Sequence, residues 1–79
     1  MKQKRVPISI HTEFITLGQL LKFASVVDSG SEAKFYLATH QIRVNGELDN
    51  RRGRKLRSKD QVEIEGVVYE IISKWSFLN

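Results

Sequence analysis

The sequence predicts an α+β domain in which a two-helix hairpin packs on a small antiparallel sheet. Two observations support this class. Two helix-start signals, each followed by apolar residues at helical spacing, occupy the first half of the chain, and short segments of alternating apolar and polar residues occupy the N-terminus and the second half. The 79 residues are enough for one domain, residues 1–79, with a core of modest size.

The helices are predicted from their caps. Residues 16–19, Thr-Leu-Gly-Gln, form a capping box, and the spacing of the apolar residues after it predicts a helix over 17–27. Residues 29–32, Ser-Gly-Ser-Glu, form a second capping box, so a second helix should begin at about residue 30. Its buried stripe is expected to consist of Ala33, Tyr36 and Leu37.

The strands are predicted from alternation. Residues 6–10 alternate, and Pro7 within them favours an edge strand. Residues 42–44 place Arg43 outward between two apolar neighbours, and the Asn45-Gly46 pair that follows is the strongest short signal for a hairpin.

The chain after the hairpin contains a basic loop and two more strands. Residues 49–59 are expected to form a polar, basic loop in which Leu56 is the apolar residue that pins it to the core. Residues 61–65 alternate again, Gly66 marks a turn, and 67–72 should form the last strand.

The positive charge is concentrated in this second half. Thirteen Lys and Arg face nine Asp and Glu, which gives a formal net charge of only +4. Seven of the thirteen basic residues nevertheless lie between positions 43 and 59, and such clustering creates a local field that attracts polyanions. These seven are Arg43, Arg51, Arg52, Arg54, Lys55, Arg57 and Lys59.

Three motifs together resemble a known family. The stretch 29–34, the hairpin sequence Ile-Arg-Val-Asn-Gly at 42–46, and the basic loop leading to Lys-Asp-Gln-Val at 59–62 are similar to the S-four RNA-binding domain (the alpha-L RNA-binding motif). The resemblance covers about residues 16–65, and the basic stretch 50–56 is especially similar to the small stand-alone YaaA-like branch. It implies a non-catalytic module that binds structured RNA, with ribosomal RNA as one candidate ligand.

The resemblance also implies a set of RNA-contacting residues at the start of helix two, on the hairpin and in the loop. Three regions depart from the family pattern: Gly30 stands where an Arg is usual, Thr16 and Gly18 stand where many members have Arg-Leu-Asp, and His40 stands where a Gly usually ends helix two. We therefore expect the loop to carry more of the electrostatic contact. The expected RNA-binding residues are Ser31, Lys34, Arg43, Asn45, Arg51, Arg52, Arg54, Lys55 and Arg57.

Some of these residues have simpler explanations. Lys34 could contact phosphate or could simply be solvated, and Ser31 could serve the helix start. Asn45 is expected to be a turn residue first, because backbone geometry alone explains an Asn-Gly pair. For the loop arginines, a nucleic-acid ligand is favoured over a merely soluble surface, because guanidinium groups match phosphate oxygens and otherwise repel one another.

Other functions find little support in the sequence. There is no cysteine, and His11 and His40 are too isolated to suggest a zinc site, so we expect no metal and no cofactor. No nucleophile elbow or Gly-rich phosphate loop is present, which argues against an enzyme. The lack of cysteine and of a long apolar run leads us to expect a cytoplasmic protein that does not span a membrane.

Two rival ligands remain open. The apolar tail from Trp75 to Leu78 could anchor a partner protein, in which case the basic loop would meet an acidic patch on that partner. Duplex DNA is a weaker alternative, because contacts to the 2′-hydroxyl favour RNA.

Overall fold

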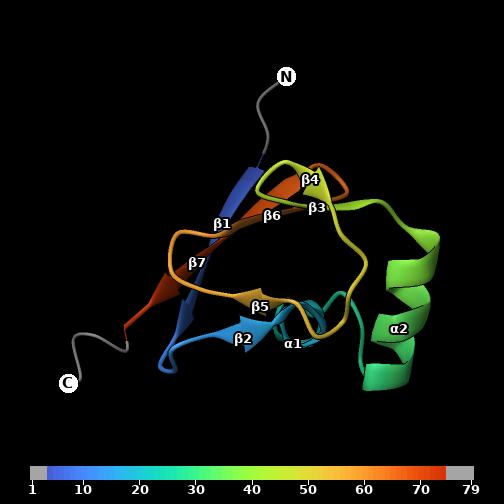
Figure 1. Cartoon of the computed structure of the whole chain (residues 1–79), viewed down its shortest axis with the longest axis horizontal. Coiled ribbons are helices and arrows are strands. Elements are labelled where there is room, and N and C mark those ends of the chain that lie inside the picture. Colours follow the sequence, from blue (N-terminus) through green and yellow to red (C-terminus); the bar gives the residue numbers. More distant parts are fainter. Residues whose placement is uncertain (1–3, 75–79) are drawn as a thin grey trace.

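The computed structural model describes residues 4–74, which form two helices, a five-stranded sheet and a separate two-stranded sheet (Figure 1). The five-stranded sheet has the order β1-β7-β6-β3-β4, and the small sheet pairs β2 with β5. In chain order the elements are β1 (Lys4–Ile10), β2 (Ile15–Thr16), α1 (Leu17–Phe23), α2 (Gly30–Thr39), β3 (Ile42–Val44), β4 (Glu47–Leu48), β5 (Lys55–Leu56), β6 (Gln61–Ile64) and β7 (Val67–Ser73).

The α+β class is confirmed, but the large sheet is mixed rather than purely antiparallel. β1 runs parallel to β7, with Val6 opposite Tyr69, whereas β6 pairs antiparallel with both β7 and β3. A parallel pair needs a long crossover connection, and here nearly the whole domain lies between the two strands. As Pro7 predicted, β1 is an edge strand.

Both predicted helices are present, and α1 is shorter than its apolar pattern suggested. The capping box of α1 is confirmed: Gln19 N–H donates to Thr16 Oγ1 at 3.2 Å, and Thr16 N–H donates to Gln19 Oε1 at 2.9 Å. The helix stops at Phe23 because the chain turns into the left-handed region at Ser25, with φ 60°. Val27, predicted to lie inside the helix, is buried beyond its end.

The second helix begins at Gly30 as predicted, because the Ser29 hydroxyl accepts a hydrogen bond from Glu32 N–H at 3.2 Å. Of its predicted stripe, Ala33 and Leu37 are buried, and Tyr36 packs partly buried against the core. The core lies between the helices and the large sheet and includes Leu17, Leu20 and Leu21 of α1, Ile42 and Val44 of β3, Val62 and Ile64 of β6, and Ile71 of β7.

The basic loop is more ordered than expected, because it contains β5. Leu56 of β5 is fully buried, which confirms that it pins the loop to the core. The sequence did not predict the pairing of β5 with β2, because each strand has only two residues and shows no alternation. Two further backbone bonds fasten the loop to α1: Leu17 N–H donates to the carbonyl of Arg54 at 2.8 Å, and Gly18 N–H to that of Arg52 at 2.9 Å.

The tail from Trp75 to Leu78, named above as a protein anchor, lies outside the described residues. Within residues 4–74, none of the helices has the length and apolar character needed to cross a bilayer.

Candidate nucleic-acid interface

The β3–β4 hairpin adopts the turn that its sequence predicts. Asn45 and Gly46 both have positive φ, 53° and 87°, as a type I′ turn requires. Arg43 is exposed between the buried Ile42 and Val44, so its side chain lies on the sheet face opposite the core. Its cross-strand neighbour on β6 is Glu63.

The side chain of Asn45 is engaged inside the protein. Its Oδ1 accepts the N–H of Gln61 at 2.9 Å, and its Nδ2 donates to Asp60 Oδ1 at 3.1 Å. The other oxygen of Asp60 accepts the backbone N–H of Arg57 at 2.7 Å. Asn45 thus ties the hairpin to the end of the basic loop, and its amide has a structural role that needs no ligand.

Asp49 organises two of the loop arginines. Its carboxylate accepts hydrogen bonds from Arg51 Nη2 at 2.8 Å and Nε at 3.1 Å, and from Arg54 Nη1 at 3.0 Å. The Asp49 side chain is only 8% exposed, whereas that of Arg51 is 68% exposed. The hydrogen bonds from Arg51, above all, hold the pKa of Asp49 well below its usual range, and the same pair raises the pKa of Arg51.

The loop is therefore not a run of uncompensated cations. The sequence prediction counted the basic residues between 43 and 59 and left out Asp49, whose carboxylate forms ion pairs with two guanidinium groups of the loop. The spacing Asp-x-Arg at positions 49–51 was the available signal. The side chains of Arg51 and Arg54 remain 68% and 33% exposed, and each guanidinium group has more N–H donors than these bonds use.

Four of the predicted cations line one shallow depression, which we call the basic groove. Phe14, another residue that the sequence did not single out, supports it from one side: Lys55 Nζ lies 5.0 Å from the centroid of its ring and Arg57 Cζ lies 5.8 Å from it. These distances are in the range of cation–π attraction. The groove is lined by Arg51, Gly53, Arg54, Lys55, Arg57 and Asp60.

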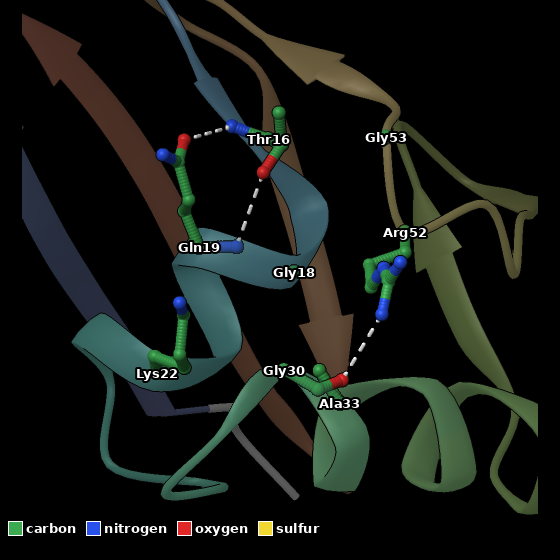
Figure 2. A pocket seen from close by; sticks show the side chains of 8 residues that line it. All are labelled: Thr16, Gly18, Gln19, Lys22, Gly30, Ala33, Arg52 and Gly53. Carbon is green, nitrogen blue, oxygen red and sulfur yellow. Dashed lines mark hydrogen bonds between the residues drawn. The ribbon is translucent and has the colours of Figure 1, made fainter.

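Arg52 lies apart from the basic groove. Its side chain runs over the start of α1, and its Nη1 donates to the carbonyl oxygen of Gly30 at 3.3 Å (Figure 2). It lines a different hollow, between the two helices and the loop. The loop thus presents its guanidinium groups in two directions.

The three remaining candidates lie outside the basic groove. Ser31 lines a hollow beside Phe35 of α2. Lys34 is exposed on α2 and lines neither the basic groove nor the hollow beside Arg52. Arg43 lies on the outer sheet face. The structure therefore brings together four of the nine predicted residues and places Arg52 in a neighbouring hollow that shares Gly53 with the basic groove.

The histidines take no part in this surface. The ring of His40 stacks on Tyr36 with centroids 3.8 Å apart, and its Nε2 lies 3.4 Å from Glu65 Oε1. Over the part of the chain that the structure describes, no group of His, Cys, Asp and Glu side chains is arranged to hold a metal ion.

The fold and the groove define a small α+β module with a surface suited to polyanions. The family model described as S4 domain matches residues 8–72, so the chain belongs to the S4-domain family, an RNA-binding module, as its motifs predicted. A relative from Bacillus subtilis (strain 168), named "Probable ribosome maturation protein RlbA", is 63% identical over 60 residues, which is 76% of this chain and 84% of that protein.

Proposed function

We propose that this protein is a non-catalytic RNA-binding module that recognises a folded RNA of the maturing ribosome in the cytoplasm. The observation that carries the proposal is the basic groove, in which Arg51, Arg54, Lys55 and Arg57 face one depression. Family membership supports RNA as the ligand, and the name of the Bacillus relative supports the ribosome as its setting.

The groove has the properties that recognition of an RNA backbone requires. A-form RNA hides its base edges in a deep, narrow groove, so proteins contact it chiefly through phosphates and shape. Asp49 and Phe14 restrain the cations of the groove, which lowers the side-chain entropy that binding would cost. Within residues 4–74, neither Lys55 nor Arg57 forms an ion pair with a carboxylate, so their charge is available to phosphates.

The test uses the double variant Lys55→Gln/Arg57→Gln and fluorescence anisotropy of a labelled hairpin from ribosomal RNA. Each lost phosphate contact should flatten the plot of log affinity against log salt by about 0.7–0.9. The matched control is Lys4→Gln/Arg5→Gln, which removes two exposed charges from the start of β1, outside the basic groove. The control should keep the slope of the unmodified protein.

Equal slopes and affinities for the two double variants would show that the groove is not the binding surface. A DNA duplex of the same sequence serves as competitor, and we expect it to displace the RNA poorly because 2′-hydroxyl contacts distinguish RNA from DNA.

A second function, docking of a partner protein, is favoured by one observation. Phe23 of α1 and Phe35 of α2 are 61% and 70% exposed, so each helix presents a large apolar side chain that a partner protein could cover. Capture of ribosomal particles by the protein, with and without nuclease, separates the two functions: RNA-mediated capture is lost after nuclease, whereas capture through the phenylalanines persists and falls in Phe35→Ala.

A further inference from the structure

A hollow distinct from the basic groove lies between the start of α1, the start of α2 and the loop (Figure 2). Its floor consists of small residues, and its rim carries two cations and two polar side chains. None of the residues that line it is acidic. They are Thr16, Gly18, Gln19, Lys22, Gly30, Ala33, Arg52 and Gly53.

Glycine at position 18 is what allows Arg52 to lie beside the hollow. A Cβ atom at Gly18 would come within 2.6 Å of Arg52 Cγ, so any other residue there would push the arginine aside. The Gly18 N–H donates to the carbonyl oxygen of Arg52 at 2.9 Å, which fixes the backbone of the loop against α1. The stem of Arg52 is therefore held in place.

The head of Arg52 remains available to a ligand. Within residues 4–74 its guanidinium group makes one hydrogen bond, to Gly30, and no ion pair, although the group has five N–H donors. Figure 2 shows the guanidinium on one side of the hollow and Lys22 on the other, with Gly30 and Ala33 below them. Both side chains are exposed.

We propose that this hollow receives one unstacked nucleotide of the bound RNA, which deepens and rests on the function proposed above. The planar guanidinium of Arg52 can stack on a base, the glycine floor allows a flat ring to approach the backbone, and Lys22 can neutralise a phosphate of the same nucleotide. The hollow shares Gly53 with the basic groove, so one RNA can occupy both. Such a site favours RNA with an unpaired nucleotide in a bulge or loop over a continuous duplex.

The experiment compares two hairpin RNAs that differ by a single unpaired adenine in the stem, with affinity measured by anisotropy. The unmodified protein should bind the bulged hairpin about tenfold more tightly, since stacking of one base contributes on this scale. The variant Gly30→Leu fills the hollow and should lose this preference. Its backbone is expected to tolerate the change, because an added Cβ would meet only Arg52 Nη1, at 4.0 Å.

Two further variants separate the hollow from general effects on α2 and on charge. Ala38→Leu adds the same side chain at an exposed position of α2 outside the hollow, and should retain the preference. Arg52→Lys keeps the charge without the planar group and should reduce the preference several-fold. A bulge that carries an abasic residue should bind as weakly as the paired hairpin.

The outcomes distinguish this inference from the proposed function. If the unmodified protein binds both hairpins equally, or prefers the abasic bulge as strongly as the adenine bulge, the nucleotide site is wrong while RNA binding stands. If Gly30→Leu retains the full preference, the site is also wrong. If neither hairpin is bound at low salt, the proposed function itself fails.

Discussion

At the scale of single residues, Asp49 determines how the basic groove is built. One carboxylate that is almost buried accepts hydrogen bonds from two guanidinium groups and from the backbone N–H of Arg51 at 2.9 Å. This carboxylate neutralises part of the positive charge of the surface, and its hydrogen bonds fix the positions of Arg51 and Arg54. A surface made only of free lysines would attract RNA but would have to order more side chains on binding.

Replacement of Asp49 by Asn should destabilise the protein by about 1 kcal/mol, because charge-assisted hydrogen bonds are lost, although water screens the exposed Arg51. The pKa of Asp49 is lowered in the folded state, so its stabilising effect is complete above the ordinary Asp pKa of about 3.9 and is lost as the pH falls below it. Urea denaturation over an acid pH series should show the two proteins converging at low pH. A constant difference would contradict this account.

At the scale of elements, the β3–β4 hairpin depends on backbone conformation at one glycine. Gly46 has φ 87°, and an added Cβ would meet nothing within 4 Å, so the cost of Gly46→Ala comes from the backbone alone. We expect a loss of about 1–2 kcal/mol in the free energy of unfolding. Gly53 is the matched control, since its surroundings are equally open and no positive φ is recorded there.

Gly53→Ala should leave stability unchanged or raise it slightly, because Ala reduces the freedom of the unfolded chain. Chemical denaturation of both variants measures the comparison. Equal destabilisation by the two substitutions would show that the turn geometry does not control the hairpin.

The elements that the sequence predicted are those whose causes are local. The caps at Thr16 and Ser29 and the Asn45-Gly46 turn depend on residues within a few positions of one another. The local sequence was therefore enough to predict their conformation. The parallel pairing of β1 with β7 and the β2–β5 ladder depend on contacts between distant segments. They leave no short pattern in the sequence.

The candidate site divides in the same way. The sequence identified the cations of the basic groove because charge is a property of the residue itself. It did not reveal that Arg52 turns away from the other arginines, because that depends on the absent side chain of Gly18, which lies in another element. Nor did it reveal that the side chain of Asn45 is committed to Asp60 and Gln61.

At the scale of the whole molecule, the proposed binding surface lies on a sparsely paired part of the fold. β6 and β7 are paired on both sides within the large sheet, whereas the basic loop is fastened by a ladder of two residues, by Leu56 and by bonds to α1. Local opening in proteins concentrates where buried contacts and paired strands are few. The strands β6 and β7 thus contribute most to stability, whereas the basic loop carries the proposed binding surface.

Hydrogen exchange should make this division measurable. In the free protein, amides of β6 and β7 should exchange slowest, and those of β5 and the loop at 50–57 should exchange much faster. Addition of the ribosomal RNA hairpin should slow exchange in that loop and at the start of α2, because a bound phosphate backbone restrains the arginines and the segment that carries them. The first residues of β1, which pair with Val67 and Val68 and do not line the basic groove, should exchange at an unchanged rate. Protection that appeared at these residues and not in the loop would place the RNA outside the basic groove and contradict the proposed binding surface.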